Sequence, residues 1–385
     1  MTPPPLEGTA GPRGSGATQQ PITPSGLRPA TEPPEARGMP RDAVRLLVAH
    51  PEGVEHHRFR DLPRFLAPGD LVVVNTSATL PAALDGRRED GREVVVHVAT
   101  ELDPVGGVVV ELRRLDGDGP VTDGQPGEWI SLPYGAGLQL VAPRDARRSS
   151  ESGPRLWLAQ AFVEDGIVPF LNAHGRPITY GYVNEAWPLD MYQTVFARRP
   201  GSAEMPSAGR PVSPELVVEL VTRGVTLAPI LLHTGVSSLE HGERPQPERY
   251  VVPPSTAALV NHTRARGGRI VAVGTTATRA LESAVDHDGR LTARHGWTDL
   301  VLGPTRPARV VSGLITGWHD AGSSHLDLLH AVVGADLVKA AYWAATASGY
   351  RWHEFGDACL YLPRSRETQG AKASRTSWRP ARHTP

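Results

Sequence analysis

The sequence predicts an α/β protein, in which a discontinuous, barrel-like α/β domain carries an inserted small β-barrel domain. Two observations lead to this fold class. From about residue 85 to residue 188, short apolar runs such as EVVVHVAT, GGVVVELRR and RLWLAQAF alternate with Gly, Pro and Asp turns. This pattern is typical of a small barrel. On both sides of that stretch, apolar strands alternate with amphipathic helices, which is typical of an α/β domain.

The order along the chain divides it into four segments. Residues 1–38 are rich in Pro, Gly and Ser with almost no apolar periodicity, so we expect a disordered tail. Residues 39–84 and 189–363 are expected to form the α/β catalytic domain, and residues 85–188 the inserted barrel. Residues 364–385 carry six Arg and Lys side chains against one acid, Glu367, which indicates a basic disordered tail.

Within the α/β domain, apolar periodicity sets the expected elements. The strands are LVVV at 71–74, TLAPILLHTG at 226–235, RIVAV at 269–273 and ARVVSGLITG at 308–317. The helices are PELVVELVTRG at 214–224, PPSTAALVNHTRARGG at 253–268, GTTATRALES at 274–283 and DLVKAAYWAATASGY at 336–350. Strands and helices therefore alternate through most of this domain.

Composition excludes several classes of protein. The chain has 385 residues and a formal net charge of −1, so no global field draws it to nucleic acid or to a membrane. Cys359 is the only cysteine, which excludes an internal disulfide framework and a cysteine-rich zinc site. The sequence has no apolar run of membrane-spanning length and no signal-peptide core. We expect a cytoplasmic protein, monomeric and without a membrane partner.

Polar residues follow several predicted strands, where α/β proteins usually bind ligands. They are Tyr192, Gln193 and Thr194; His233; Gly274, Thr275 and Thr276; Trp297, Thr298 and Asp299; and His319. The turn at Gly274 opens a helix, whose free N–H groups favour acceptor atoms of a ligand. A structural alternative is that Thr276 caps this helix while Arg279 and Glu282 pair on its surface. His233 likewise has a structural alternative, a hydrogen bond to a backbone carbonyl.

The segment LITGWHDAGSSHLDLLH concentrates histidine and aspartate, which are common metal ligands. His325 and His330 are five residues apart, however, and helix-borne ligand pairs use a spacing of four. We therefore expect no metal. The sequence contains no nucleophile elbow, Walker loop, zinc-protease motif or dinucleotide fingerprint.

Long segments of the chain resemble the S-adenosylmethionine:tRNA ribosyltransferase-isomerases of queuosine biosynthesis. The resemblance runs from about Arg41 to Leu362 and rests on PRDAVRLLV, HHRFRDLPRFLAPGDLVVVN, YQTVFARRPGSAEMPSAG, GGRIVAVGTTATRALESA, GWTDLVL and YRWHEFGDACL. It implies an α/β domain with an inserted β-barrel, in agreement with the strand pattern. It also implies transfer and isomerisation of the ribosyl group of S-adenosylmethionine, the co-substrate, onto 7-aminomethyl-7-deazaguanine in tRNA. The products would be epoxyqueuosine, adenine and methionine, and no metal would be required.

The matched motifs imply roles for individual residues. His233, His319 and Asp299 are the catalytic candidates, the two histidines because neutral imidazole can accept a proton near neutral pH. The expected substrate-binding residues are Asn75, Tyr192, Gln193, Thr194, Ser207, Gly209, Gly274, Thr275, Thr276, Arg279, Trp297 and Thr298.

Several positions depart from the family pattern. Thr76, Ser77 and Ala78 replace an Asp-Thr-Arg run, and the remaining changes are Ala83 for arginine, Pro211 for histidine, Gly317 for asparagine and Gly322 for lysine. Alanine and glycine offer neither charge nor donor in place of a lost cation. Three functions stay open: the family reaction on tRNA, a related reaction of S-adenosylmethionine with a different, small-molecule acceptor, and a non-catalytic binding protein.

Overall fold

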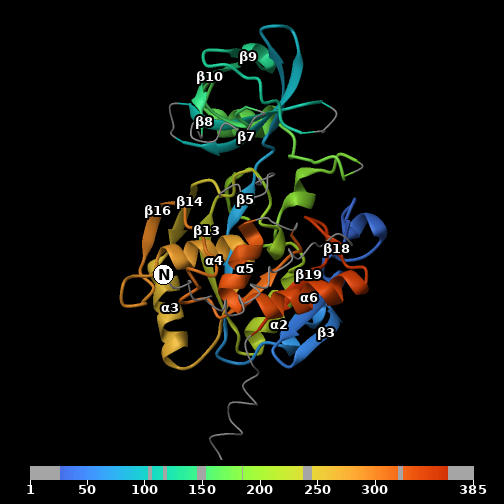
Figure 1. The fold of residues 1–385 in the computed structure, drawn as a ribbon, viewed down its shortest axis with the longest axis vertical. Helices are drawn as coiled ribbons and strands as arrows, with labels where there is room; N and C mark the ends of the chain where they lie inside the picture. Colours follow the sequence, from blue (N-terminus) through green and yellow to red (C-terminus); the bar gives the residue numbers. More distant parts are fainter. Residues whose placement is uncertain are drawn as a thin grey trace, which may run out of the picture.

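The computed structural model describes residues 27–102, 106–115, 119–144, 153–183, 185–236, 245–319 and 324–362. Two separate bodies of β-structure are visible in Figure 1, a small barrel above a larger α/β part. Strand β5 (Ser77–Thr79) leads from the α/β part toward the barrel (Figure 1). The predicted fold class, an α/β domain with an inserted small barrel, is confirmed.

The barrel closes in the strand order β10-β11-β8-β7-β6-β9. Its strands are β6 (Ala83–Arg88), β7 (Glu93–Glu101), β8 (Gly107–Arg113), β9 (Trp129–Ser131), β10 (Gly137–Pro143) and β11 (Leu156–Phe162). Alternate side chains such as Val94, Val96 and Val98 point into one apolar core. Helix α1 (Ile167–His174) adds Ile167 and Leu171 to the same core.

The α/β part is built on a mixed sheet in the order β16-β14-β13-β4-β15-β17-β19-β2-β3. In chain order these strands are β2 (Arg45–His50), β3 (Gly53–Arg58), β4 (Leu71–Asn75), β13 (Thr226–Leu232), β14 (Glu248–Val252), β15 (Ile270–Val273), β16 (Arg294–Thr298), β17 (Gly313–Thr316) and β19 (Ala358–Tyr361). The central four strands, β13, β4, β15 and β17, run parallel. The sheet is open between β16 and β3, so the expectation of a barrel-like α/β domain gives way to an open sheet.

Helices cover both faces of this sheet, which explains why its central strands are apolar throughout. Leu71 and Val73 of β4 pack on one face with α3 (Pro254–Ala265), α4 (Gly274–Ser283), α5 (Ser324–Val333) and α6 (Ala335–Ala347). Val72 and Val74 pack on the other face with α2 (Pro214–Thr222) and the short helix η3 (Phe59–Arg64). Among the described helices, none is by itself long and apolar enough to cross a membrane; α5 and α6 meet that length only as a pair bent by 119°.

The described part of the N-terminal segment is ordered. Strand β1 (Arg28–Pro29) pairs in parallel with β18 (Arg351–Trp352), and the side chain of Ala30 is buried. Glu35, on the short helix η1 (Pro34–Arg37), contacts the buried Arg210 at 2.9 Å. The predicted disordered tail over residues 1–38 is therefore wrong for residues 27–38, because long-range pairing orders them. Residues 1–26 and the predicted basic tail at 364–385 lie outside the described residues.

The chain returns from the barrel through residues 163–188 and the short helix η5 (Leu189–Tyr192). Strand β12 (Arg199–Ser202) then pairs in parallel with β5, so the outgoing and returning segments lie side by side. This pairing brings residues of the return segment to the carboxyl end of β4.

Candidate functional site

The carboxyl ends of the four parallel strands meet at one edge of the sheet. Asn75 ends β4, His233 follows β13, Gly274 follows β15, and Thr316 ends β17. Strand β5 leaves this same edge toward the barrel (Figure 1). Ligands of open α/β sheets bind outside the carboxyl ends of the strands, so this edge is the candidate site.

Asn75 joins three elements at this edge. Its side-chain amide donates to the carbonyl of Leu232 at 2.8 Å, and its carbonyl oxygen accepts from the Leu232 amide at 3.0 Å. The same amide group lies 3.3 Å from Oγ1 of Thr276. Asn75 is only 4% exposed and is occupied by protein partners, so its contribution is to fix β4, β13 and α4 relative to one another.

His233 is held by Ser77, which is bonded in turn to Ser202; the two serines come from the two segments linking the barrel. Oγ of Ser77 lies 2.7 Å from Nδ1 of His233 and 2.6 Å from Oγ of Ser202, which also accepts from the amide of Thr234. The backbone of Gly201 packs against the imidazole, since a Cβ there would lie 2.5 Å from the ring. Burial, together with nearby arginines, lowers the pKa of His233 to about 4. The imidazole is therefore neutral and fixed in orientation at neutral pH.

The turn after β15 has the positive φ that favours glycine, 91° at Gly274. No side chain caps α4, so the alternative in which Thr276 is a cap is wrong. Oγ1 of Thr276 instead faces Asn75, and Thr278 donates to the carbonyl of Gly274 at 3.1 Å. The first N–H groups of α4 therefore have no side-chain partner among the described residues, as expected of a helix end that receives a ligand.

Arg279 and Glu282 do not pair with each other on the helix surface; both side chains are buried. The guanidinium of Arg279 donates to the carbonyls of Leu300 and Thr298 and forms an ion pair with Glu248. Glu282 accepts three backbone N–H bonds, from Arg309, Val310 and Val311. Arg279 is thus a structural group, in contrast to the substrate-binding role expected from the sequence.

The Tyr-Gln-Thr segment lies beside β5. Gln193 pairs through its side chain with both backbone groups of Thr79, at 3.0 and 2.8 Å, and so closes the strand end rather than reaching for a ligand. Thr194 accepts from the amide of Phe196. Tyr192 differs from both, because its hydroxyl is buried and has no hydrogen-bond partner among the described residues. Ser207 is half-buried and Gly209 buried in the short helix η6 (Ser207–Gly209), where Gly209 faces Thr194.

Trp297, Thr298 and Asp299 lie at the outer end of the same edge. Thr298 pairs with Glu248 on β14. The carbonyl of Arg249, the next residue of β14, accepts a hydrogen bond from the His233 amide. Thr298 is buried and contacts Ser283 at 2.5 Å, whereas Trp297 and Asp299 are exposed. Asp299 is solvent-accessible, and its catalytic role stays a prediction.

His319 is paired with a residue that the sequence analysis did not assign to the site. Its ring stacks on His325 with centroids 4.4 Å apart and planes 6° from parallel. Its Nε2 lies 2.9 Å from Oγ1 of Thr316, and its amide is 3.0 Å from the Tyr342 hydroxyl. Burial lowers the pKa of both rings, that of His325 to about 4. In the described parts of the chain, no group of three or more His, Cys, Asp or Glu side chains is arranged to hold a metal ion.

The family described as queuosine biosynthesis protein matches residues 26–361. Two curated relatives named S-adenosylmethionine:tRNA ribosyltransferase-isomerase come from Moorella thermoacetica and Symbiobacterium thermophilum. They are 37% identical over 347 and 345 residues, which cover 84% of this chain and 94% of each relative. The chain belongs to the queuosine biosynthesis protein family. The solved S-adenosylmethionine tRNA ribosyltransferase from Thermotoga maritima is 29% identical to this chain, with a TM-score of 0.47. The match covers 88% of this chain and 97% of the Thermotoga chain.

Against the queuosine biosynthesis family pattern, the substituted positions lie at the candidate edge and at the entry to the barrel. Ala78 lies on β5, Ala83 is buried at the start of β6, and Pro211 is buried after η6. Gly317 directly follows β17. At Ala78 and Ala83 the arginine of the family pattern is absent.

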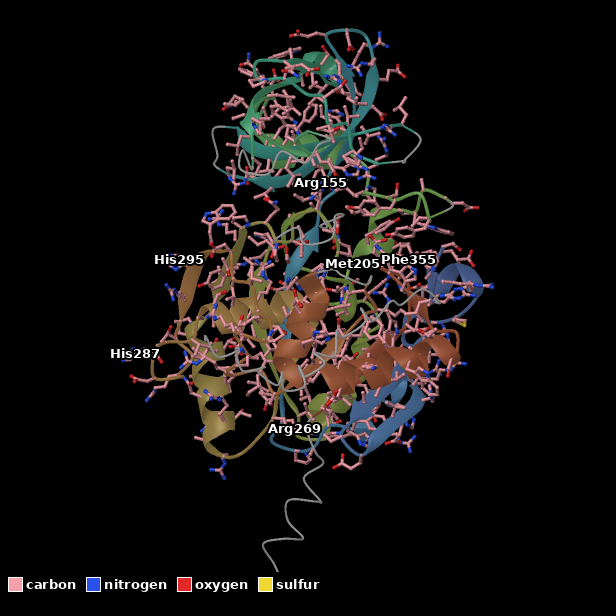
Figure 2. The ribbon with its side chains drawn as sticks, viewed as in Figure 1. Arg155, Met205, Arg269, His287, His295 and Phe355 are labelled. Atoms are coloured by element: carbon pink, nitrogen blue, oxygen red, sulfur yellow. The ribbon has the colours of Figure 1, made fainter. Side chains whose placement is uncertain are left out.

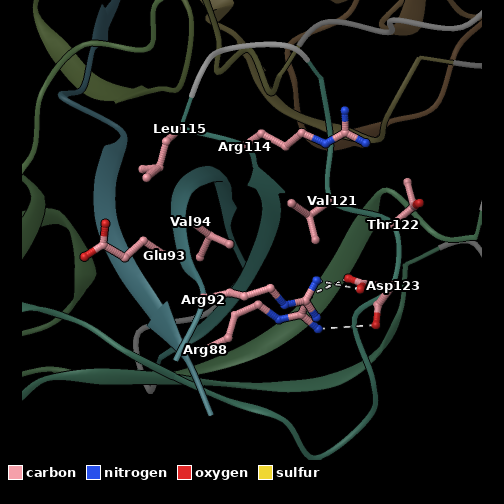
Figure 3. A pocket seen from close by; sticks show the side chains of 9 residues that line it. All are labelled: Arg88, Arg92, Glu93, Val94, Arg114, Leu115, Val121, Thr122 and Asp123. Atoms are coloured by element: carbon pink, nitrogen blue, oxygen red, sulfur yellow. Dashed lines mark hydrogen bonds and ion pairs between the residues drawn. The ribbon is translucent and has the colours of Figure 1, made fainter. Parts of the chain in front are cut away.

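The barrel carries a cavity of about 510 Å³ near the β6–β7 turn (Figure 3). Arg88 and Arg92 reach into it, and both are ion-paired with Asp123, at 2.5 and 2.9 Å. Arg88 is also paired with Glu128. The barrel's own carboxylates therefore satisfy both of these guanidiniums.

The sequence pattern does not point to five further residues of this region: Ser77, Ser202, His325, His353 and Glu354. Ser77 and Ser202 lie in segments 125 residues apart that meet only through the pairing of β5 with β12. His353 and Glu354 lie within YRWHEFGDACL, a segment that carries the family resemblance, and this position is the one feature of the sequence that could have indicated them.

Proposed function

We propose that the protein transfers and isomerises the ribosyl group of S-adenosylmethionine onto 7-aminomethyl-7-deazaguanine in tRNA, releasing adenine and methionine. The observation that carries this proposal is the match to S-adenosylmethionine:tRNA ribosyltransferase-isomerases over 84% of the chain. The arrangement of the strand ends supports it, because histidines and a free helix N-terminus converge where α/β proteins bind ligands. The expected setting is the cytoplasm.

In this proposal His233 is the general base or the group that orients it. A sulfonium acidifies the adjacent C5′ protons, so a weak, neutral base is sufficient to start the reaction. The Ser77 contact fixes the imidazole, and a neutral ring does not repel the cationic sulfonium. Methionine then leaves readily because its departure neutralises the sulfur. The first N–H groups of α4 would donate hydrogen bonds to polar oxygens of either substrate.

A second candidate is the same use of S-adenosylmethionine with a small-molecule acceptor. The charge of the barrel favours it, since residues 83–178 contain 10 Arg and no Lys against 15 Asp and Glu. An acidic surface repels a polyanion and steers cations. The alanines at positions 78 and 83, in place of arginines of the family pattern, act in the same direction.

Adenine release measured by chromatography tests both candidates. The protein is incubated with S-adenosylmethionine alone, with tRNA that carries 7-aminomethyl-7-deazaguanine, and with the free base. Release that depends on the tRNA supports the first candidate, and release that depends on the free base supports the second. Binding of S-adenosylmethionine without adenine release in any mixture would contradict both and leave the non-catalytic function.

A further inference from the structure

Glu354 is a nearly buried carboxylate that no Lys or Arg of the described chain neutralises. Its side chain is 8% exposed. Its partners among the described residues are the Tyr182 hydroxyl at 3.4 Å and Nδ1 of His353 at 3.5 Å, both to the oxygen Oε2. No Lys or Arg of the described chain lies within ion-pair distance. Buried charges in proteins are normally paired, and a carboxylate has about four acceptor positions.

A second polar group near Glu354 also lacks a partner. Tyr192 is 2% exposed, and its hydroxyl has no hydrogen bond to any described residue. Its ring packs on Phe355, the neighbour of Glu354, with centroids 5.2 Å apart. Burial and the negative charge of Glu354 raise the pKa of the Tyr192 hydroxyl, which therefore stays protonated and able to donate. Figure 2 places Phe355 and Met205 at the top of the α/β part, toward the barrel.

Flat rings lie beside the carboxylate. The ring of His353 is 4.2 Å from that of Tyr182 and 4.8 Å from that of Trp352. The backbone of His353 is left-handed, with φ of 76°, a conformation that is unfavourable for a residue with a side chain. The turn that includes it closes with the Gly356 amide bonded to the His353 carbonyl, at 2.9 Å. This strained turn holds His353 and Glu354 against the segment that returns from the barrel.

The group adjoins the candidate site at the sheet edge. Burial lowers the pKa of both His319 and His325, and His353 makes a smaller contribution to each, so the three imidazoles lie within electrostatic reach of one another. The backbone carbonyl of Tyr192 accepts a hydrogen bond from the Thr79 hydroxyl of β5 at 2.7 Å.

We propose that Glu354 and Tyr192, with the rings of Tyr182 and His353, form a subsite for a primary ammonium group carried on a flat heterocycle. The ammonium supplies the cation that Glu354 lacks, and the Tyr192 hydroxyl donates to an acceptor atom of the heterocycle. The inference rests on the proposed function in one respect, that the ligand is the acceptor of the ribosyl group. It applies equally to an acceptor base in tRNA and to a free one.

The test compares two ligands and two carboxylates. Binding of 7-aminomethyl-7-deazaguanine and of 7-methyl-7-deazaguanine is measured by calorimetry in the presence of S-adenosylhomocysteine. The wild type should prefer the amine by roughly 30-fold or more, as for a desolvated charge pair, and Glu354→Gln should reduce the preference to about threefold or less. Glu219→Gln, which removes an exposed carboxylate on α2, is the matched control and should keep the preference.

Thermal unfolding separates this role from a structural one. If the carboxylate awaits a ligand, ligand-free Glu354→Gln should melt at the same or a higher temperature than the wild type, because an unpaired buried charge has been removed. A clear fall in melting temperature would overturn the proposal and indicate an internal pair with protonated His353. An unchanged amine preference in Glu354→Gln, or none in the wild type, would overturn it as well.

A third measurement does not depend on the reaction. Benzylamine carries a methylammonium on a flat ring without any deazaguanine, and its binding is followed by NMR against benzyl alcohol. The wild type should bind benzylamine in preference and Glu354→Gln should not. Failure of adenine release would contradict the proposed function alone, whereas equal binding of benzylamine and benzyl alcohol by the wild type would contradict the subsite alone.

Discussion

The hydroxyl oxygen of Ser77 lies 2.7 Å from Nδ1 of His233, across 156 residues of sequence. The contact joins the segment that leaves for the barrel to the end of the central strand β13. With Nδ1 occupied, the free nitrogen Nε2 is the one available to a substrate. This relationship makes His233 the best-oriented imidazole at the candidate edge.

Replacing Ser77 by alanine should impair catalysis more than folding. Without its partner the imidazole loses its fixed orientation, so we expect kcat to fall roughly tenfold or more with little change in KM for S-adenosylmethionine. Ser202 loses a partner too, so unfolding should require about 1–2 kcal/mol less free energy. Ser312→Ala is the control, since Ser312 bonds the backbone of Ile270 at the opposite edge. An unchanged kcat in Ser77→Ala would remove His233 from the mechanism.

Gly201 and Gly296 form a matched pair for testing the space around His233. Their φ angles are 153° and 149°, so an alanine meets similar backbone strain at either position. At Gly201 the new Cβ would lie 2.5 Å from the imidazole, whereas at Gly296 nothing lies within 4 Å. We therefore expect both variants to lose stability through backbone strain, Gly201→Ala more than Gly296→Ala because of the clash, and only Gly201→Ala to lose most of its activity. Equal activities at saturating substrate would show that the position of the ring is unimportant.

The threonines that open α4 should affect binding rather than stability. Neither caps the helix, so Thr275→Ala and Thr276→Ala should each change the free energy of unfolding by less than about 1 kcal/mol. Loss of a ligand contact should weaken binding of S-adenosylmethionine, measured by calorimetric titration. Wild-type affinity in both variants would make the turn purely structural.

Much of the fold follows from local patterns, and the errors have a common cause. The strand, glycine and helix around Gly274 and the turn-bounded strands of the barrel depend on neighbouring residues, which the sequence displays directly. Ordering of Arg28 and Pro29 depends instead on pairing with Arg351 and Trp352, more than 300 residues away. A Pro-rich composition gives no sign of such a partner.

The candidate site was predictable at the level of strand ends but not at the level of contacts. The positions of His233 and His319 after apolar strands indicated one edge of a sheet. Arg279 and Glu282 look like an exposed helical pair from their spacing, yet both are buried and bonded to the loops that pack on α4. The stacking of His325 on His319 depends on where α5 begins in space, which no spacing rule gives.

Acid should destabilise the protein in a window set by its histidines. His233 and His325 have a pKa of about 4 when folded, against about 6.5 for an unfolded chain. Between these values the unfolded state binds more protons, so the free energy of unfolding falls as pH falls from about 6.5 toward 4. Urea unfolding at several pH values should show a shallower slope for His325→Gln than for the wild type. The same slope in both proteins would contradict the burial of this ring.

The proposed reaction moves the ribosyl carbons of S-adenosylmethionine to an acceptor. The most direct measurement uses S-adenosylmethionine labelled in its ribose and follows the label after incubation with tRNA carrying 7-aminomethyl-7-deazaguanine or with the free base. We expect the label to enter the acceptor, with one adenine released for each ribosyl group transferred. Label that stays in S-adenosylmethionine, or leaves it without entering either acceptor, would contradict ribosyl transfer by this protein.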